Sequence, residues 1–252
     1  LKTIRECIQT METPEAVAIV SPWRSQLASI PGGQEKKDCL MLFTDDVFWK
    51  IFNFDFVSGS PYTKEEVQSG IKKVVIAESL ANRLYGTSDA AGKTIMISYK
   101  PYTVSGVVKD VSTIAKASYS EVWVSYSAEP FPDDPWAESI TGWYQAIILA
   151  HSPSDFDAIR QEAKELCRRY NTTTVQYDFV LNNQPDTVFH AWMSEGDSFN
   201  SPELLKIYLQ IILIILLLLL VPSINLTGMT ASRMKKRMEE LGIRKAFGAE
   251  NR

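Results

Sequence analysis

A long stretch of this chain, from Ile207 to Ser232, contains no charged residue, and its first part reads IYLQIILIILLLLLV. An α-helix rises about 1.5 Å per residue and the hydrocarbon core of a bilayer is about 30 Å thick, so about 20 apolar residues can cross it. The 23 residues from Ile207 to Met229 are therefore enough. We predict one transmembrane helix within residues 204–232.

Two other interpretations of this stretch are weaker. The buried helix of a soluble protein is one alternative, but such helices seldom run this far without a charge. A secretory signal peptide is excluded, because about 200 residues of ordinary composition precede the stretch.

The flanks of the predicted helix indicate its orientation. Four basic residues lie between positions 233 and 237, whereas Lys206 is offset by Glu203 on the other side. Basic residues are concentrated on the cytoplasmic side of membrane helices. We therefore predict a cytoplasmic basic helix over residues 233–252 and an extracytoplasmic domain over residues 1–203.

The distribution of net charge along the chain supports the same orientation. Residues 233–252 contain seven lysines and arginines against three acidic residues, a net charge of +4, and the whole chain carries −4, which leaves −8 for residues 1–232. An acidic outer domain argues against nucleic acid as a partner.

Short strand-like and helix-like segments alternate through the outer domain, which predicts an α+β (mixed α/β) fold. Pro101 lies in the turn of a predicted hairpin, and Gly86 is the expected C-terminal cap of a short helix. The predicted strands are 16–21, 39–43, 74–77, 93–98, 102–108 and 121–126, and the predicted helices are 47–54 and 78–85.

The clearest local unit is a strand at 146–150, an amphipathic helix at 155–170 and a β-prone stretch at 173–181. Ser154 is the expected N-cap, with Asp157 three residues later. This order is typical of an open-faced α/β sandwich. The predicted apolar face of the helix consists of Phe156, Ile159, Ala163, Leu166, Cys167 and Tyr170.

The three cysteines, Cys7, Cys39 and Cys167, are scattered and show no metal-ligand spacing. One disulfide is conceivable in an extracytoplasmic domain, but the position of Cys167 on the apolar helix face favours a buried thiol. The sequence leaves their disulfide state open.

Few residues suggest catalysis. His151 and His190 have no partner at ligand spacing and are expected in loops, and Gly32-Gly33 lacks the Lys-Ser/Thr of a phosphate loop. Asp45-Asp46 and Asp133-Asp134 could be read as acid–base or cation sites, but paired carboxylates in turns are usually N-caps or exposed charges. We predict no catalytic residue, no metal site and no cofactor.

The basic segment after the predicted membrane helix carries an apolar stripe. Met234, Met238 and Leu241 recur at helical spacing, and Glu240 and Arg244 are ordered for an i,i+4 ion pair. Such a helix requires a partner. The alternative is an interfacial helix held by anionic membrane lipid.

Two residues in the predicted span, Pro222 and Asn225, suit a lone membrane helix poorly. Proline removes a backbone hydrogen bond, and an asparagine amide needs a polar partner in lipid. We predict that they pack against other membrane helices. The alternative for Asn225 is an interfacial position near the cytoplasmic side.

Three stretches resemble the MacB/FtsX-like permeases of ABC transporters: 43–61 (FTDDVFWKIFNFDFVSGSP), 74–112 (from VVIAESLANRLYG to VVKDVS) and 224–249 (INLTGMTASRMKKRMEELGIRKAFGA). The resemblance implies a MacB-like periplasmic core domain followed by the second of four membrane helices. It also implies a ferredoxin-like porter subdomain with an inserted mixed α/β subdomain at about 40–115. The chain, which starts at Leu1 without an initiator Met, would then be a fragment of the permease.

The resemblance further implies a non-catalytic permease subunit that couples ATP hydrolysis by a partner to efflux or release of a substrate by mechanotransmission. The implied partners are an ABC-type ATPase, a second permease copy or homologue, and a periplasmic protein in some related systems. The resemblance leaves open whether the ATPase is fused elsewhere in the chain or is a separate subunit, and we expect a separate subunit. The segment implied to contact the ATPase contains Met238, Leu241, Ile243, Arg244, Lys245 and Phe247.

Two rival functions remain. A membrane-anchored sensor would continue after Arg252 into a signalling domain, whereas a permease would continue into further apolar spans. An anchored hydrolase would need a nucleophile or metal constellation that the sequence does not contain.

Overall fold

The computed structural model describes residues 1–128, 144–173, 179–181, 184–193 and 204–248. These residues form two compact units, Leu1–Thr187 and Val188–Arg252. The first unit is mixed α/β, and the second contains the helices α6 (Val188–Met193) and α7 (Leu204–Ala246). The predicted mixed α/β class with one long apolar helix is confirmed.

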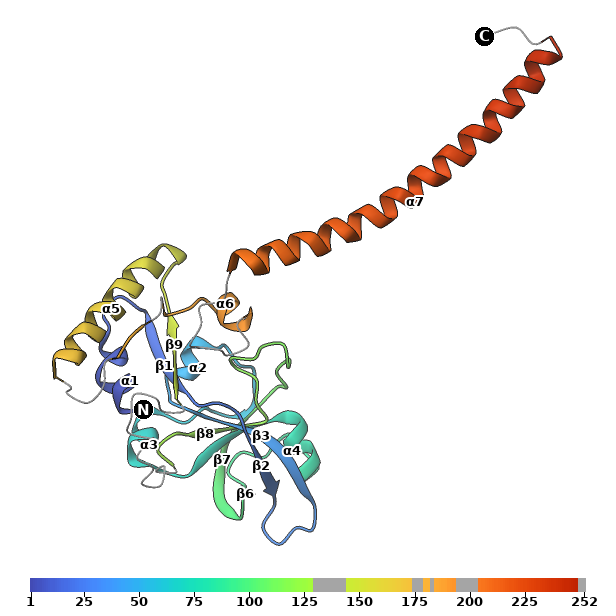
Figure 1. Cartoon of the computed structure of the whole chain (residues 1–252). Coiled ribbons are helices and arrows are strands. Elements are labelled where there is room, and N and C mark those ends of the chain that lie inside the picture. Colours follow the sequence, from blue (N-terminus) through green and yellow to red (C-terminus); the bar gives the residue numbers. More distant parts are fainter. Residues whose placement is uncertain (129–143, 174–178, 182–183, 194–203, 249–252) are drawn as a thin grey trace. The chain divides into compact units, whose positions relative to one another are not determined.

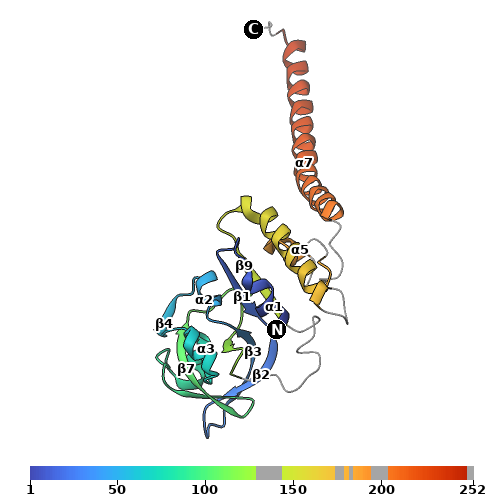
Figure 2. The ribbon, with the colours of Figure 1, turned by 90° about the vertical axis from the view of Figure 1, so that its left-hand side faces the viewer.

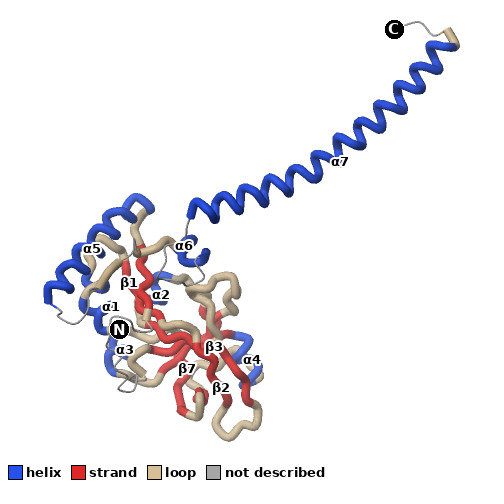
Figure 3. Tube along the Cα trace, viewed as in Figure 1, coloured by secondary structure: helices blue, strands red, loops and turns tan. Residues whose placement is uncertain are grey.

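Six strands of the first unit pair in a closed ring, in the order β2-β6-β7-β5-β8-β3 and back to β2. The β3–β8 and β5–β7 pairs are parallel and the other pairs of the ring are antiparallel. Figure 3 shows these strands in red. Their bounds are β2 Arg24–Ser29, β3 Lys36–Thr44, β5 Lys73–Ala77, β6 Thr94–Ile97, β7 Lys100–Val108 and β8 Val122–Ser125.

Apolar side chains fill the inside of this barrel, as expected for a ring of few strands. Val74, Ile76, Ile95 and Val107 are completely buried there. The helix α4 (Glu78–Tyr85) adds Leu80 and Leu84 to the same core and ends at Gly86, whose φ of 70° gives the predicted left-handed cap. The strand β4 (Phe56–Gly59) pairs with the end of β7.

A second core, rich in aromatic rings, lies on another face of the barrel. Trp123 of β8 and Phe48 of α2 (Phe48–Ile51) are both fully buried in it. Trp49 and Phe54 make edge-on contacts with Trp123 at 6.0 and 5.4 Å between ring centroids. The capped helix α3 (Lys64–Ser69) packs Val67 against this core.

The rest of the first unit is an α/β layer. Strand β1 (Ala16–Val20) pairs antiparallel with β9 (Gln145–Leu149) over five residues. The helix α1 (Lys2–Glu6), the 3-10 turn η1 (Ile8–Thr10) and the helix α5 (Phe156–Thr173) share a small apolar core with this pair, which includes Ile8, Val17, Ile159 and Ala163. Figure 2 shows α5 and α1 beside β1 and β9.

The predicted hairpin is present, but its turn begins one residue before the predicted Tyr99-Lys100-Pro101 and ends at Tyr99. The turn consists of Ser98 and Tyr99, with φ values of 46° and 68°, and Pro101 lies inside β7 opposite Met96. Backbone with positive φ at both central residues matches the twist of the flanking strands. In a hairpin with a two-residue turn, the pair that closes the turn is hydrogen-bonded and the next pair is not. Pro101 and Met96 form this next pair, so the missing N–H of proline removes no hydrogen bond between the two strands.

Other sequence predictions also need adjustment. The alternating residue pattern at 121–126 predicts a strand with one exposed face, but all four residues of β8 are buried. Phe156 is exposed on α5, whereas Ile159, Ala163 and Cys167 are buried as predicted. The predicted strand 173–181 lies mostly outside the described residues, and α5 extends to Thr173.

The cap before α5 differs from the prediction. A 3-10 turn, η2 (Pro153–Asp155), precedes α5, and Ser152 caps it in place of Ser154. The Ser152 amide donates to the Asp155 carboxylate at 3.0 Å, so the acidic member of the capping box is Asp155 and not Asp157. Proline at the first position of the turn moves the start of the helical segment to Ser152.

We expect Ser152→Ala to lower the stability of the full-length protein in detergent by about 1 kcal/mol, because it removes the capping hydroxyl. Ser154→Ala is the matched control and should cost less. Thermal unfolding curves of the two variants provide the measurement. A larger loss for Ser154→Ala would contradict the observed cap.

Candidate functional site

The helix α7 runs without interruption over 43 residues, as Figure 3 shows in blue. Within the described residues it is the one helix long and apolar enough to cross a membrane, with a mean hydropathy of 2.6 in its most apolar part. A helix of this length extends about 65 Å, roughly twice the thickness of a hydrocarbon core. A membrane-spanning α7 would therefore project beyond one bilayer surface.

Pro222 lies inside α7 and is accommodated there. Its ring removes one backbone donor, and Figure 1 shows that α7 is a curved helix. Nearby hydroxyl groups are satisfied within the helix: Ser223 Oγ donates to the Leu219 carbonyl at 2.7 Å, and Thr227 Oγ1 donates to the Ser223 carbonyl at 2.8 Å. Such back-bonding removes the need for water.

Asn225 is exposed on α7 and borders a shallow depression that also includes Gly228 and Ser232. A second depression is lined partly by the small residues Ser223, Thr227, Gly228 and Ala231. Small residues four positions apart let another membrane helix approach closely. Packing at Pro222 and Asn225 was predicted from the sequence, whereas a contact through these small residues was not, although their four-residue spacing indicates one.

The course of the backbone at the basic end of α7 decides how the predicted coupling residues are arranged. The helix continues through Gly242 to Ala246, and Gly248, with φ of 83°, follows its end. At about 100° per residue, Leu241 and Ile243 point about 200° apart on one continuous helix. The predicted coupling residues are therefore divided between two faces.

One face carries Met234, Met238 and Leu241, and the other carries Ile243 and Phe247, with Arg244 next to it. All five apolar side chains are exposed, and Phe247 is the most exposed of them at 87%. The structure brings together the members of each face but does not bring the two faces together. An exposed apolar stripe among basic residues is suited to binding a protein surface.

The two histidines and the paired carboxylates form no site in the described residues. His151 is exposed in a loop, with Nδ1 3.6 Å from the Glu15 carboxylate. His190 lies in α6, and the loop predicted for it is wrong. Asp45 accepts from the amide of Phe48, the first residue of α2, at 3.0 Å. Asp133-Asp134 lie outside the described residues.

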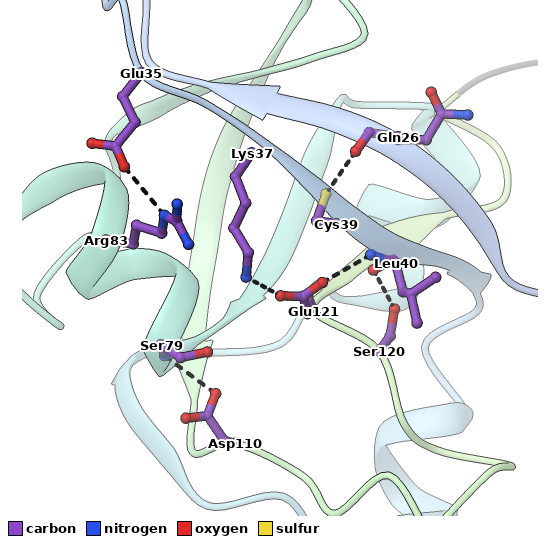
Figure 4. A network of polar contacts seen from close by, with 10 residues as sticks. All are labelled: Gln26, Glu35, Lys37, Cys39, Leu40, Ser79, Arg83, Asp110, Ser120 and Glu121. Atoms are coloured by element: carbon purple, nitrogen blue, oxygen red, sulfur yellow. Dashed lines mark hydrogen bonds and ion pairs between the residues drawn. The ribbon is translucent and has the colours of Figure 1, made fainter.

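A polar network on the barrel, drawn in Figure 4, joins strands. The Glu121 carboxylate forms an ion pair with Lys37 and accepts from the Leu40 amide at 3.0 Å, while Ser120 Oγ donates to the Leu40 carbonyl at 2.8 Å. These contacts join the residues just before β8 to Lys37 and Leu40 of β3. Other contacts of the network are Arg83–Glu35, Ser79–Asp110 and Cys39–Gln26.

The three cysteines are buried free thiols. Burial, followed by the nearby Glu121 carboxylate, raises the pKa of Cys39 to about 12. Cys167 Sγ donates to the Phe179 carbonyl at 2.7 Å, consistent with the predicted buried thiol. Among the described residues, no three His, Cys, Asp or Glu side chains are grouped as metal ligands.

The described residues thus form a mixed α/β domain with an attached barrel, followed in the chain by an apolar helix that is long enough to cross a membrane and has a basic end. The family model for the MacB-like periplasmic core domain matches residues 3–166. The chain belongs to this family. The resemblance to MacB/FtsX-like permeases of ABC transporters is thereby confirmed.

Curated relatives agree with this assignment. The macrolide export ATP-binding/permease protein MacB 1 of Yersinia pestis bv. Antiqua (strain Antiqua) is 23% identical over 98% of this chain and 36% of its own length. MacB of Neisseria gonorrhoeae (strain ATCC 700825 / FA 1090) is 25% identical over 76% of this chain and 28% of its own length. This chain thus spans about a third of the curated relatives it matches.

Two solved structures share the fold. One is a domain of a permease protein from Porphyromonas gingivalis, with a TM-score of 0.53 and 16% identity over 78% of this chain and 88% of that one. The other is the extracellular domain of the ABC-type transporter YknZ from Gram-positive bacteria, with a TM-score of 0.51 and 18% identity over 69% of this chain and 84% of that one.

Proposed function

We propose that this chain is part of the permease subunit of a MacB/FtsX-like ABC transporter and transmits ATP-driven movement to the far side of a bacterial inner membrane. The observation that carries the proposal is the match to the MacB-like core domain over residues 3–166, followed by a helix of spanning length with a basic end. In this proposal residues 1–203 lie outside and residues 233–252 lie in the cytoplasm. The α/β layer is the ferredoxin-like porter subdomain.

The continuity of α7 supports the mechanical part of the proposal. A helix is a stiff element, because most of its backbone groups are hydrogen-bonded within it, and Pro222 removes only one such donor from α7. The structure has no break between the apolar part of α7 and its basic part, so movement at the basic end would reach the outer end. The permease itself needs no catalytic residue for this task, and a partner ATPase supplies the chemistry.

The basic end of α7 is the proposed contact with that ATPase. Ile243 and Phe247 form one exposed apolar pair with Arg244 beside it, whereas Lys245, two positions from each, lies on the face of Met238 and Leu241. Apolar side chains that a partner removes from water provide most of the affinity. The positive charge of Arg244 favours a partner with acidic residues around the contact. Met238 and Leu241, on the other face, would meet a second surface of the assembly or anionic lipid.

Pro222 and Asn225 complete the proposal within the membrane. The Asn225 amide lacks water in lipid and needs a hydrogen-bonding partner on a neighbouring helix. The small residues near it allow a close helix contact. A second permease copy or another helix of the same permease would supply this contact, and an outer-side protein is a further candidate partner.

The test is a pull-down of the full-length membrane protein from detergent, followed by mass spectrometry. We expect an ABC-type ATPase in about equal amount, as a separate subunit. An ATPase found in the same polypeptide would preserve the transporter assignment and correct only the separate subunit. Recovery of outer-side proteins alone, even after crosslinking, would contradict the proposal and favour the anchored sensor.

A further inference from the structure

The short helix α6 contacts the start of α7 through two aromatic rings. The Phe189 ring of α6 stacks on the Tyr208 ring of α7, with 6.4 Å between the ring centroids and 17° between the ring planes. Both helices belong to the unit Val188–Arg252, and Figure 1 shows α6 beside the first turns of α7. Stacked rings at this separation attract each other beyond the effect of the area that they bury. The stack therefore holds α6 against the end of α7 where the apolar stretch begins.

The apolar side chains around this stack are exposed. Val188 and Phe189 of α6 are 74% and 46% exposed, and Tyr208 of α7 is 45% exposed. Leu205 and Leu209 are exposed as well and share one face of α7 with Tyr208, because they lie three positions before it and one position after it. Exposed apolar side chains that are grouped in this way mark a contact with a partner or a membrane.

The bilayer that α7 is suited to cross is the surface that covers this group. Tyr208 begins the segment of spanning length, so the ring on which Phe189 stacks is continuous with the lipid-facing surface of the helix. Tyrosine is enriched where hydrocarbon meets water, because its ring is apolar and its hydroxyl group is polar. The sequence of α6, VFHAWM, contains one polar residue, His190, and otherwise suits the same boundary.

The charged residues at the two ends of the apolar stretch do not fix its depth in a bilayer. Lys206 is the last charged residue before the stretch, and Arg233 is the first one after it. The 26 residues between them extend about 39 Å as a helix, roughly 9 Å more than the hydrocarbon core. The helix could slide by about six residues, or tilt, without drawing a charge into the core. Another element has to select one depth.

We propose that α6 and the start of α7 form an interfacial anchor, consisting of Val188, Phe189, Leu205, Tyr208 and Leu209, which lies between the lipid headgroups and the acyl chains and sets the depth of α7. With Tyr208 at this boundary, the hydrocarbon core ends about 20 residues later, near Gly228. Ser232 then lies among the headgroups of the other leaflet. The inference rests on the proposed function only for the side of the membrane, which places α6 at the outer surface.

The test measures the depth of α6 in the full-length protein, reconstituted in vesicles of equal parts phosphatidylcholine and phosphatidylglycerol. Val188→Cys carries an environment-sensitive fluorophore next to the stack. Ile215→Cys, inside the apolar stretch, gives the reference for the hydrocarbon core, and labelled free cysteine gives the reference for water. Cys7, Cys39 and Cys167 are buried, and the parent protein without an introduced cysteine gives the background.

Three quenchers report the depth of each label: lipids with a nitroxide near the headgroup, lipids with a nitroxide near the chain end, and iodide in the water. We expect the label at Val188 to be quenched at least about twofold more by the shallow nitroxide than by the deep one. The label at Ile215 should show the reverse order. Strongest quenching of the Val188 label by iodide or by the deep nitroxide would overturn the inference. Protection from all three quenchers would also overturn it, because protein and not lipid would then cover α6.

Two double variants test the rings themselves. Phe189→Ser with Tyr208→Ser removes the stack, and shallow quenching of the Val188 label should fall by about half or more. Phe189→Trp with Tyr208→Trp keeps two rings suited to the interface and should preserve the quenching. Both positions are exposed, so neither variant opens a buried core. Equal quenching in the Ser variant and the wild type would contradict anchoring by these rings.

A label at the other end of the span tests whether the anchor sets the depth. Ser232→Cys should be quenched mainly by the shallow nitroxide in the wild-type background. In the variant with serine at positions 189 and 208, its ratio of shallow to deep quenching should change by about half or more, because the helix is free to slide. An unchanged ratio would overturn the depth-setting role.

The outcome is separable from the proposed function. Nitroxide lipids are present in both leaflets, so the measured depth depends neither on the side of the membrane that carries the first unit nor on an ATPase. Failure of the pull-down to recover an ATPase would remove the proposed function and leave the quenching to decide on the anchor. A Val188 label in water would remove the anchor and leave the result of the pull-down unchanged.

Discussion

Replacing Ile243 and Phe247 together by Asp in the full-length protein is expected to abolish its association with the ATPase. The two side chains lie one helical turn apart on one face of α7 and are 59% and 87% exposed. Burying two uncompensated carboxylates at a protein contact costs far more than the apolar contact provides. The pull-down from detergent should therefore recover less than about a hundredth of the ATPase recovered with the wild type.

A control variant tests whether the loss depends on the positions of the new carboxylates or only on the change in net charge. Lys235→Gln with Arg237→Gln changes the net charge by the same amount, but leaves both apolar faces intact. It should weaken recovery of the ATPase by roughly tenfold or less, as expected for charges at the rim of an interface. Full recovery with the double Asp variant would exclude the Ile243–Phe247 face as the contact.

Replacing Trp123 by Ala should destabilise the first unit by about 4 kcal/mol. Trp123 is fully buried, packs against Trp49 and Phe54, and donates from Nε1 to the Ser118 carbonyl at 3.2 Å. The replacement leaves a large cavity between β8 and α2. Thermal unfolding of the full-length protein in detergent should show the midpoint falling by roughly 10 °C.

Trp123→Phe tests which part of the side chain matters. It keeps an aromatic ring in the core and loses the indole donor, so we expect a cost of about 1–2 kcal/mol. Equal losses for the two variants would mean that the hydrogen bond, and not the packing, dominates at this position.

Much of the strand and helix order was predictable from residue patterns. The apolar runs that became β1, β3, β5 and β9 are bounded by turn-forming residues, and Gly86 marks the end of α4. These signals are local, because they depend on the spacing of neighbouring side chains. The long apolar helix was predictable for the same reason.

Closure of the barrel could not be predicted, because it depends on pairs between strands far apart in the chain. The predicted limits of the inserted subdomain, about 40 and 115, remain a prediction, but the ring also uses β2 and β8, which lie outside them. The shift of the helix cap from Ser154 to Ser152 has a similar cause, since two serines two residues apart compete for one role.

The same distinction between local and long-range signals applies to the candidate functional residues. The apolar positions near the basic end of α7 could be identified from their spacing, but their separation into two faces depends on whether the helix stops at Gly242. Asp45 could be recognised only as a cap. Its contacts with Gln9 and Ile19 bring together residues that lie 36 and 26 positions away in the chain, and no local pattern indicates them.

The ring of β2, β6, β7, β5, β8 and β3 has a consequence for how neighbouring copies behave. Each of its strands has a hydrogen-bonded neighbour on both sides, so the ring offers no unpaired strand to another molecule. In the proposed arrangement, domains anchored in the same membrane would meet one another far more often than molecules free in solution. The ring would offer them no strand to exchange, so among the described strands only those outside the ring, such as β9 with its single partner β1, would leave an edge for such contacts.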